Sequence, residues 1–357
     1  MKRILLIGAG HAHLVALRSL AEKALYGARV TLVAPWPEQI YGGMLPGLIA
    51  GHYELREVMV DVGGLAARAH AELVHGAVQA LDLTRKLVRL ADGTEIAFDI
   101  ISLNIGSAMD RSIPGAAVRS LAVKPFENFV AELNEKTVAR VAIAGAGAAG
   151  MEIAMALRYR GVAVTLYSGS QTVSPGLAAR LLPLLRRAGV DYRPGMPVDS
   201  IEPGPVVMSG PSSQDFDLVL LATGAVPIEW PQRSGLHADE RGFVLVDPML
   251  RSVSHPFVFA VGDCATSRDV PMPKAGVYSV RQGEALIENL RREVTDEALA
   301  RFRPRKGALS ILSCGTRYAV AERGTWSAQG HWVWRWKDWI DRRWLKSLNG
   351  NGRKPSG

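Results

Sequence analysis

The feature that most constrains this chain is a glycine-rich turn that occurs twice, each time between a short apolar strand and a helical pattern. In the first copy, residues 4–7 lead into Gly8 and Gly10, His11 opens the helix, and residues 30–33 form the next strand. In such a unit the first glycine makes the turn, the second lets the backbone approach a phosphate, and the helix N-terminus attracts it. The sequence therefore predicts a dinucleotide site at Gly8 and Gly10, with His11 able to donate to phosphate.

His13 occupies the position at which the pattern G-x-G-x-x-G has its third glycine. That glycine serves the packing of the helix against the strand rather than the approach of phosphate. We therefore expect the site to persist, with a looser helix–sheet contact than in the second copy. A redox role for His11 or His13 is the less favoured alternative.

The second copy has the full glycine spacing. Gly145, Gly147 and Gly150 follow the apolar residues 141–144, and residues 162–166 form the next strand. A single turn of this kind is a weak signal, because a well-packed strand–helix turn can also contain glycines. Two turns in the same structural context predict two dinucleotide sites.

Three further segments are expected to be strands. Residues 98–106 and 216–224 are near-duplicates in which an aromatic–Asp pair precedes an apolar run that ends in glycine. Residues 258–263 form an apolar strand that ends in Asp263, at the strand end where α/β sheets bind polar ligand groups. The predicted fold class is α/β, with two Rossmann-like dinucleotide-binding domains, the second inserted in the first, and a small C-terminal hairpin and helix.

The expected domain boundaries follow from the order of these segments. Residues 1–110 and 231–303 would form the first domain and residues 111–230 the inserted one. Residues 304–357 would form the C-terminal region.

Composition narrows the class of protein. A hydrophobic content of 48% with 36 glycines is typical of a globular, loop-rich α/β enzyme. Two cysteines, Cys264 and Cys314, can form neither a disulfide framework nor a four-ligand zinc site, so we predict no metal and a cytoplasmic location. The formal charge of +8 is concentrated in residues 332–357, which contain seven basic and two acidic residues. These charges form no recognised nucleic-acid motif, and we expect no nucleic-acid partner.

The order of the motifs resembles the pyridine nucleotide-disulfide oxidoreductase superfamily, flavoproteins with two dinucleotide-binding domains. GAGHAHL, GAGAAGME, LLATG and FAVGDCA follow one another over nearly the whole chain. Within the superfamily, GAGHAHL, YGGMLPGLIAGH and KAGVYSVRQG resemble an FAD-dependent subfamily that occurs alone or fused in front of selenide, water dikinase. Type II NADH dehydrogenases and sulfide:quinone reductases are more distant relatives.

The resemblance implies FAD in the first fold and NADH or NADPH in the second. The residues implied for FAD include Asp263, which would bond the ribityl chain, and Ala275, where a helix pointing at the flavin would begin. The full set for FAD is Gly8, Gly10, His11, Pro46, Gly106, Asp263 and Ala275. The set for the second nucleotide is Gly145, Gly147, Gly150, Ser168 and Gly224.

Three residues are candidates for catalysis. Lys274, just before Ala275, would add positive charge beside the flavin, and Lys124 is a candidate near the same ring; the alternative for both is a solvated lysine. Glu152 lies where related NADH dehydrogenases have a glutamate near the nicotinamide and the flavin, so we expect a contact or proton-handling residue. The alternative for Glu152 is an acid that only favours the helix dipole.

The chain departs from the family pattern at the ribose-binding acid. A carboxylate is expected at the end of the second strand of each fold, where this chain has Ala34 and Ser168. Ser168 excludes neither NADH nor NADPH, and Arg158 and Arg160 are candidates for a 2′-phosphate. The second fold could also have kept only its architecture.

The predicted function is that of an FAD-dependent oxidoreductase that passes electrons from NAD(P)H through flavin to a quinone or another small acceptor. A redox disulfide is not expected, because the stretch YGGMLPG lacks the cysteine pair of the disulfide reductases. One alternative is a flavoprotein that oxidises or reduces a sulfur or selenium compound. Another is a flavin-based redox sensor or docking protein with slow turnover.

The segment HWVWRWKDWIDRRWLKSLNG predicts a basic amphipathic helix. At 100° per residue, one face is expected to carry Trp332, Val333, Trp336, Trp339, Ile340 and Trp344. Such a helix suits a membrane surface, here through residues 332–348, and quinone-reducing relatives dock through C-terminal helices. The alternatives are packing on the protein itself and contact with a second copy in a homodimer. A peripheral location on the inner face of the membrane is the alternative to a purely cytoplasmic one.

Overall fold

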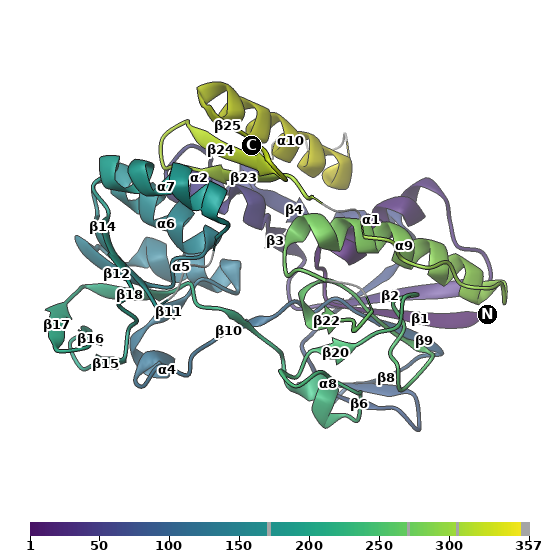
Figure 1. The fold of residues 1–357 in the computed structure, drawn as a ribbon. Coiled ribbons are helices and arrows are strands. Elements are labelled where there is room, and N and C mark those ends of the chain that lie inside the picture. Colours follow the sequence, from purple (N-terminus) through teal and green to yellow (C-terminus); the bar gives the residue numbers. More distant parts are fainter. Residues whose placement is uncertain (170–172, 270–271, 305–306, 351–357) are drawn as a thin grey trace.

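The computed structural model describes residues 1–169, 173–269, 272–304 and 307–350. Within these residues, two five-stranded parallel sheets form the two nucleotide folds (Figure 1). The first has the order β21-β9-β1-β2-β5, formed by Val258–Ala260, Ile100–Leu103, Lys2–Ile7, Ala28–Ala34 and Glu72–His75. The second has the order β11-β18-β12-β13-β14, formed by Leu121–Ala122, Leu218–Leu221, Arg140–Ala144, Ala163–Ser168 and Asp191–Pro194. The predicted α/β class with two Rossmann-like folds is confirmed.

The two sheets repeat one arrangement. In each, the strand before the glycine turn (β1 or β12) is central, with the next strand of the βαβ unit on one side and the crossover strand on the other. Residues 4–7 of β1 and 141–144 of β12 are buried along their whole length, as expected for parallel strands covered on both faces. The glycine turns therefore emerge at the C-terminal edge of each sheet, where α/β folds bind their ligands.

Antiparallel segments interrupt both folds at corresponding points. A three-stranded meander, β6-β7-β8, lies between β5 and β9, and a second, β15-β16-β17, lies between β14 and β18. The bounds of these strands are Val78–Asp82, Leu87–Leu90, Glu95–Ala97, Ser200–Glu202, Val206–Ser209 and Ser212–Asp215.

The chain passes between the folds through a short antiparallel pair, β10 with β19, formed by Ala108–Met109 and Ala225–Val226. This pair lies close to the first two expected domain boundaries. The division into residues 1–110, 111–230, 231–303 and 304–357 stays a proposal. Two further two-stranded pairs are β3 with β4, formed by Glu38–Ile40 and Met59–Asp61, and β20 with β22, formed by Val244–Leu245 and Ala265–Thr266.

Helices connect and cover the strands. α1 follows the first glycine turn and packs closely on α9, and α6 follows the second turn and packs on β13, α7 and α2 (Figure 1). The longer helices are α1 (His11–Glu22), α3 (Val62–Arg68), α5 (Phe126–Glu135), α6 (Ala148–Tyr159), α7 (Pro175–Arg187) and α9 (Gly276–Val294). The short ones are α2 (Leu45–Ile49), α4 (Ala116–Arg119), α8 (Trp230–Arg233), η1 (Gly42–Met44), η2 (Leu55–Glu57) and η3 (Gly262–Cys264).

The C-terminal region consists of an antiparallel sheet and a helix. The predicted hairpin is formed by β23 (Ser310–Ser313) and β24 (Ala319–Arg323), and a third strand, β25 (Trp326–Gly330), joins it. The last helix, α10 (His331–Asn349), packs on this sheet and also on β4, α3 and α1 (Figure 1). Residues 351–357 of the basic tail, with Arg353 and Lys354, lie outside the described residues.

The predicted apolar face of α10 is only partly the face that packs on the protein. Trp332 and Trp339 are 52% and 57% exposed, whereas Trp334 and Leu345, which lie off the predicted face, are buried. The inner side of α10 instead carries a polar pair: Lys337 and Asp341 form a buried ion pair within the helix. Lys337 also donates to the carbonyl of Gly43, and Asp341 accepts from the hydroxyl of Tyr41, so both residues are bonded to the first fold. No helix among the described residues is long and apolar enough to cross a membrane.

Candidate active site

The first glycine turn lies against the crossover strand β9 and its polar end. Gly8 has a φ of +85°, and a Cβ added there would lie 2.6 Å from the carbonyl oxygen of Asn104. A Cβ at Gly10 would lie 2.5 Å from Asn104 Oδ1, so neither position accepts a side chain. Asn104 also accepts a hydrogen bond from the backbone N–H of His13 and donates to the carbonyl of Val261. Asn104 thus joins the glycine turn to the Gly-Asp strand end; it is missed by the sequence analysis, although it is a polar residue at the end of an apolar strand.

His13 fills the place of the third glycine as a packing residue. Its side chain is fully buried; Nδ1 lies 2.6 Å from the carbonyl oxygen of Gly8, and Nε2 lies 2.8 Å from Ser102 Oγ. Because a carbonyl only accepts, Nδ1 carries the proton and Nε2 accepts from the Ser102 hydroxyl. Burial lowers the pKa of His13 to about 4, so the ring is neutral. The contact that we expected to be looser is therefore filled by a hydrogen-bonded ring.

Two helix N-termini meet at the first site. α1 begins after Gly10 and α9 after Ala275, and neither helix has a side-chain cap. The two starts are close, because a Cβ at Gly276 would lie 3.4 Å from Nε2 of His11. Helix N-termini without side-chain caps attract negative charge, so their proximity makes this a site for an anion such as a pyrophosphate.

Charged side chains surround these helix starts. Lys124 Nζ forms an ion pair with Asp263 at 3.1 Å, and both groups act on His11, whose pKa is lowered mainly by burial. Lys274 donates to the carbonyl of Ala265 and lies 4.0 Å from the ring centroid of Phe243. Burial lowers the pKa of Lys274, and the nearby Asp263 opposes that shift. Both lysines are thus engaged inside the protein and are not freely solvated.

The residues of the first fold fit FAD. Gly106 has a φ of +72°, and a Cβ there would meet no other atom within 4 Å, so close packing does not account for this glycine. Within the described part of the chain, the adjacent Ser107 hydroxyl is buried and has no hydrogen-bond partner. Pro46 is buried in the first turn of α2. An open glycine backbone, an unpaired buried hydroxyl and uncapped helix N-termini are what an extended, polar dinucleotide requires.

The second glycine turn is closed by backbone contact alone. Gly145 has a φ of +110°, and a Cβ at Gly150 would lie 1.9 Å from the carbonyl oxygen of Gly145. The helix that follows, α6, has Gly147 as its N-cap and no side-chain cap. A Cβ at Gly224 would meet no atom within 4 Å, as at Gly106 in the first fold. This turn therefore fits a second dinucleotide.

A pocket of about 690 Å³ lies beside the second turn. Ser168, the last residue of β13, is buried at this pocket. The lining residues are Ala146, Met151, Ser168, Gly169, Val173, Ala178, Leu182, Arg186, Val190, Asp191, Tyr192, Pro194 and Gly195. The pocket contains both apolar surface for a base and polar groups for a ribose.

Arg158 and Arg160 do not belong to this pocket, and their assignment to a 2′-phosphate is wrong. Arg158 donates to the carbonyls of Val162 and Ala188, before the start of β13 and at the end of α7. Arg160 is the C-cap of α6. Both lie at the N-terminal edge of the sheet, whereas the glycine turn and Ser168 lie at its C-terminal edge. The two arginines are close to Ser168 in the sequence, but the length of β13 separates them from Ser168 in space.

Glu152, in the first turns of α6, faces the C-terminal sheet. Its Oε1 accepts a hydrogen bond of 2.7 Å from the backbone N–H of Ser313. Burial raises the pKa of Glu152 to about 7, while the nearby Lys337 opposes the shift. A carboxyl with this pKa can take and release a proton near neutral pH.

The two cysteines do not form a redox pair. Both are free and buried. Burial raises the pKa of Cys264 to about 11 and that of Cys314 to about 12, so both are thiols at neutral pH. Cys264 donates to the carbonyls of Val261 and Leu103, which indicates a packing role. Among the described residues, no group of three His, Cys, Asp or Glu side chains is placed to hold a metal ion.

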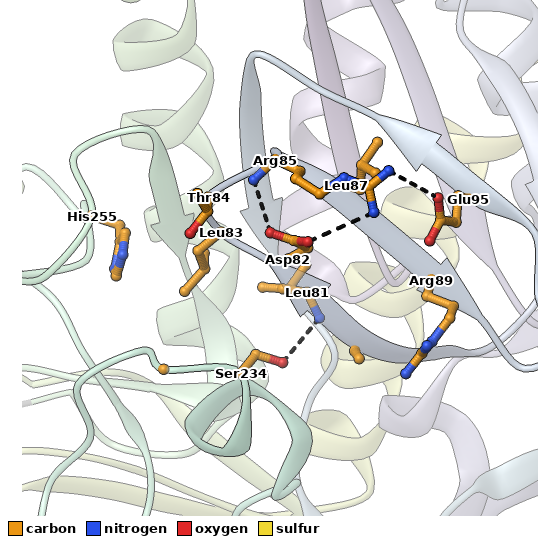
Figure 2. A pocket seen from close by; sticks show the side chains of 12 residues that line it. Leu81, Asp82, Leu83, Thr84, Arg85, Leu87, Arg89, Glu95, Ser234 and His255 are labelled. Atoms are coloured by element: carbon orange, nitrogen blue, oxygen red, sulfur yellow. Dashed lines mark hydrogen bonds and ion pairs between the residues drawn. The ribbon is translucent and has the colours of Figure 1, made fainter.

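A second pocket, of about 530 Å³, lies on the β6-β7-β8 meander of the first fold (Figure 2). Its walls include Arg85, which is within 3.9 Å of Asp82 and 3.8 Å of Glu95. Ser234 also lines the pocket, and its Oγ accepts a hydrogen bond from the backbone N–H of Leu81. None of the predicted site residues lines this pocket, and three of its charged residues, Asp82, Arg85 and Glu95, lie within ion-pair distance of one another.

Comparison with known proteins places this architecture in a family. The profile described as pyridine nucleotide-disulphide oxidoreductase matches residues 2–283. The chain belongs to this family. Its members are flavoprotein oxidoreductases that use FAD with NADH or NADPH. The likeness of the first turn to flavoproteins fused to selenide, water dikinase stays a prediction from the sequence.

Two curated relatives and two solved structures illustrate the likeness. The chain is 32% identical to the nitric oxide reductase FlRd-NAD(+) reductase of Aeromonas salmonicida, over 56% of this chain and 53% of that protein. It is 22% identical to an NADH dehydrogenase-like protein of Bacillus subtilis, over 87% and 90%. The sulfide:quinone oxidoreductase of Aquifex aeolicus has a TM-score of 0.80 at 17% identity, covering 98% of this chain and 92% of that one. The water-forming NADH oxidase of Lactobacillus brevis, bound to NADH, has a TM-score of 0.77 at 21% identity, covering 91% and 75%.

Proposed function

We propose that the protein takes hydride from NADH or NADPH onto FAD and passes the electrons to a quinone or another small acceptor, without a redox disulfide. The observation that carries this proposal is the pair of glycine turns, each followed by a helix without a side-chain cap, in a chain whose two thiols are buried. The turns offer two dinucleotide sites, and the buried thiols offer no dithiol route for the electrons.

In this proposal the first fold holds FAD, which accepts hydride and can release electrons to an acceptor. Gly8 and Gly10 bring the backbone and the start of α1 to the pyrophosphate. Asp263, which forms an ion pair with Lys124, would accept hydroxyl hydrogen bonds from the ribityl chain. The positive end of the α9 helix dipole, at Ala275, would stabilise negative charge on the flavin ring. His11 and the backbone at Pro46 and Gly106 complete the cradle.

The second fold would hold the nicotinamide nucleotide at Gly145, Gly147 and Gly150, with Ser168 at its ribose and Gly224 beside its chain. Ser168 itself brings no negative charge to the site, and the pocket lining contains one carboxylate, Asp191, and one cation, Arg186. Both NADH and NADPH are therefore candidate donors.

Among the candidate catalytic residues, Glu152 has the clearest chemistry. Its carboxyl, with a pKa near 7, is suited to supply the proton that accompanies reduction of the acceptor. Lys124 would stabilise the negative charge of Asp263, and Lys274 would stabilise negative charge on the flavin at the start of α9.

An anaerobic titration of the purified protein tests the function. NADH, then NADPH, then sulfide or selenide is added while the flavin absorbance is followed. We expect rapid bleaching by a nicotinamide nucleotide. Bleaching by sulfide or selenide alone would favour the sulfur or selenium alternative, and no bleaching by any of them would favour a slow sensor. Protein that carries no flavin after expression in flavin-replete cells would contradict all three.

We also propose that the outer face of α10, within residues 332–348, contacts an anionic membrane surface. Trp332 and Trp336 stack at 6.4 Å, Trp326 meets Trp336 edge-on at 6.4 Å, and Arg343 lies over Trp339. Exposed tryptophans beside cations suit lipid headgroups. A homodimer through the same face is the alternative.

Liposome flotation tests this surface. The double variant Trp332→Ser with Trp339→Ser is expected to lose flotation on vesicles with anionic lipid. Tyr26→Ser, at an 87% exposed residue on the first fold, is the control and should float like the parent. Equal flotation of all three proteins would contradict membrane contact, and loss of a dimer peak in gel filtration would favour the homodimer.

A further inference from the structure

A buried asparagine at the end of β9 has contacts that the proposed function does not yet use. Asn104 is 3% exposed, and its backbone N–H donates to the carbonyl of Ile7 at 2.8 Å. A Cβ added at Gly10 would lie 2.5 Å from Asn104 Oδ1, and one added at Gly262 would collide with Asn104 Nδ2. One amide group therefore fills the space between the first glycine turn and the strand end that carries Asp263.

Asn104 makes a hydrogen bond to α1 that the helix cannot make with its own residues. The N-cap residue of α1 is Gly10, which has no side chain, and the helical bonding begins with the N–H of Leu14. Asn104 Oδ1 accepts a hydrogen bond of 3.1 Å from the N–H of His13, the third residue of the helix. Where the N-cap residue is polar, its own side chain accepts from an N–H at this place. Asn104 is thus a remote cap that another strand supplies.

The remote cap leaves the first two N–H groups of α1 for a ligand. Within the described part of the chain, the N–H groups of His11 and Ala12 donate to no protein acceptor. A capping side chain at Gly10 would bond or cover one of them, whereas a cap from Asn104 keeps their approach open. Two N–H groups at a helix start are suited to a phosphate.

The other end of the same amide holds the Gly-Asp strand end. Asn104 Nδ2 donates to the carbonyl of Val261 at 2.9 Å. The N–H of the next residue, Gly262, donates to Oε1 of Gln282 on α9, and Gln282 is 1% exposed. The two amides therefore connect α1, the residue before Asp263, and α9. To these three elements the proposed function assigns the pyrophosphate, the ribityl chain and the flavin ring.

The second fold has the same backbone at this point but lacks the amide. The N–H of Ala222 donates to the carbonyl of Ala144 at 2.9 Å, which is the backbone bond that Asn104 makes in the first fold. The methyl side chain of Ala222 cannot cap α6 or bond a neighbouring strand. The link is therefore a property of the first fold and not a requirement of this kind of glycine turn.

We propose that Asn104 is a positioning residue for FAD. It fixes the start of α1 relative to Gly262 and Asp263, and it thereby keeps the cofactor bound between turnovers. A site that is already held in its binding geometry binds more tightly, because less ordering is needed when the ligand arrives. This inference rests on the proposed function, in which the first fold retains FAD and the second exchanges its nucleotide in each cycle.

A purely structural role gives a different expectation. Loss of Asn104 would then lower the stability of the flavin-free protein without changing the affinity of the folded protein for FAD. Asn289 is the matched control, because it is also fully buried and also bonds two backbone segments. Its Nδ2 donates to the carbonyls of Met249 and Ala300, and its Oδ1 accepts from the N–H of Ala300. It lies about 20 Å along α9 from the helix start at Gly276.

The dissociation constant of FAD tests the proposal without turnover. The parent, Asn104→Ala and Asn289→Ala are stripped of flavin, checked for folding by circular dichroism, and titrated with FAD while the flavin fluorescence is followed. We expect Asn104→Ala to raise the dissociation constant about 10- to 100-fold, because two hydrogen bonds of buried groups are lost. Asn289→Ala should lower the urea midpoint of the flavin-free protein and keep the parent dissociation constant.

A second variant gives a signature that a loss of stability cannot imitate. In Asn104→Asp, the carboxylate still accepts from the N–H of His13, but it cannot donate to the carbonyl of Val261. Its negative charge also lies at the helix start that we assign to phosphate. We expect the dissociation constant of FAD to rise about 100-fold or more at about pH 8.

Acid should reverse the defect of Asn104→Asp. The protonated carboxyl again has one donor and one acceptor, and burial raises its pKa, so the ratio of variant to parent dissociation constants should fall between about pH 8 and about pH 5. The ionisable groups around the first site, His11, Lys124 and Asp263, are the same in both proteins. The ratio therefore isolates the introduced carboxyl. If Asn104→Ala does not fold without flavin, this pH series decides the question.

Three results would overturn the inference. Asn104→Ala could bind FAD as tightly as the parent. The two alanine variants could weaken FAD binding equally, which would indicate a general loosening of the fold. The ratio for Asn104→Asp could also stay constant over the whole pH range. A parent protein that binds no FAD would instead contradict the proposed function.

Discussion

In the first nucleotide fold the helix after the glycine turn carries a histidine where it passes its strand, and in the second it carries a glycine. His13 fills the contact with a neutral ring that bonds the carbonyl of Gly8 and the hydroxyl of Ser102. Gly150 leaves no space at all, because its Cα is already packed on the carbonyl of Gly145. Both turns nevertheless present an uncapped helix to the same edge of a parallel sheet.

The difference separates two roles that the glycine pattern combines. The first two glycines open the backbone to phosphate, and they are present in both folds. The third position determines how the helix packs on its strand. At this position the first fold uses the hydrogen-bonded side chain of His13, and the second fold uses a direct backbone contact at Gly150. The two solutions should respond differently to mutation and to pH, and that difference can be measured.

The largest effect is expected from Gly150→Ala. A Cβ there would lie 1.9 Å from a backbone oxygen that cannot move without the turn, so we expect a loss of about 4 kcal/mol or more in the free energy of unfolding. Reduction by NAD(P)H should fall by at least about 100-fold, with the FAD content kept. Urea unfolding and stopped-flow flavin reduction measure these effects.

Gly63→Ala is the control for Gly150→Ala, because the nearest atom to a Cβ at Gly63, inside α3, is 3.8 Å away. Its stability should be unchanged or slightly higher. A Gly150→Ala protein as stable and active as the parent would show that α6 can move away from its turn.

The next largest effect is expected from His13→Gly, which restores the family pattern. The substitution leaves a cavity and two unpaired polar groups, at Gly8 and Ser102, so we expect a loss of about 3 to 4 kcal/mol in the free energy of unfolding. Flavin retention on gel filtration should fall as well. A protein that is as stable as the parent would mean that α1 closes onto its strand when the ring is removed.

The pH dependence of stability distinguishes the two turns further. The folded-state pKa of His13, about 4, is below the ordinary value of 6.5, so its contribution is complete above pH 6.5 and is lost as the pH falls toward 4. The expected loss is about 3 kcal/mol. Urea unfolding of the parent and of His13→Gln across this range should show a steeper acid slope in the parent, since His11, whose pKa is also lowered, titrates in both proteins. Equal slopes would contradict a buried, neutral His13.

The smallest effect is expected from Ser102→Ala. This change removes the hydroxyl that donates to Nε2 and keeps the stronger contact between Nδ1 and Gly8. We expect a cost of about 1 kcal/mol in unfolding free energy and no change in flavin reduction. A cost as large as that of His13→Gly would indicate that the Ser102 bond, and not the packing of the ring, holds α1.

Much of the fold could be predicted because its signals are local. The strands around both glycine turns and the two crossover strands have apolar runs and turn residues within one short window. β25 could not be found in this way, because Trp326–Gly330 is short, polar in part and paired only at the edge of its sheet. The formation of β25 depends on its pairing with β24 rather than on the pattern of its own residues.

The candidate site divides in the same way. Gly8, Gly145 and Asp263 follow from motifs, whereas the partners of His13 and α10 lie far away in the sequence. Ser102 is 89 positions from His13, and Asp341 is 300 positions from Tyr41. The helical pattern of α10 therefore predicted an amphipathic helix, and Val333 of the predicted face is buried, but the pattern could not show that the polar Lys337–Asp341 pair is buried as well.

One consequence of α10 concerns how the protein can be dissected. Its outer tryptophans and its inner ion pair belong to a single helix of 19 residues. A chain cut before His331 would lose both at once, so a fall in turnover after such a cut would not report on lipid attachment. Point changes on one side of the helix are required instead, because replacing α10 with the last helix of a relative would change its packing on β4, α3 and α1 together with its outer surface.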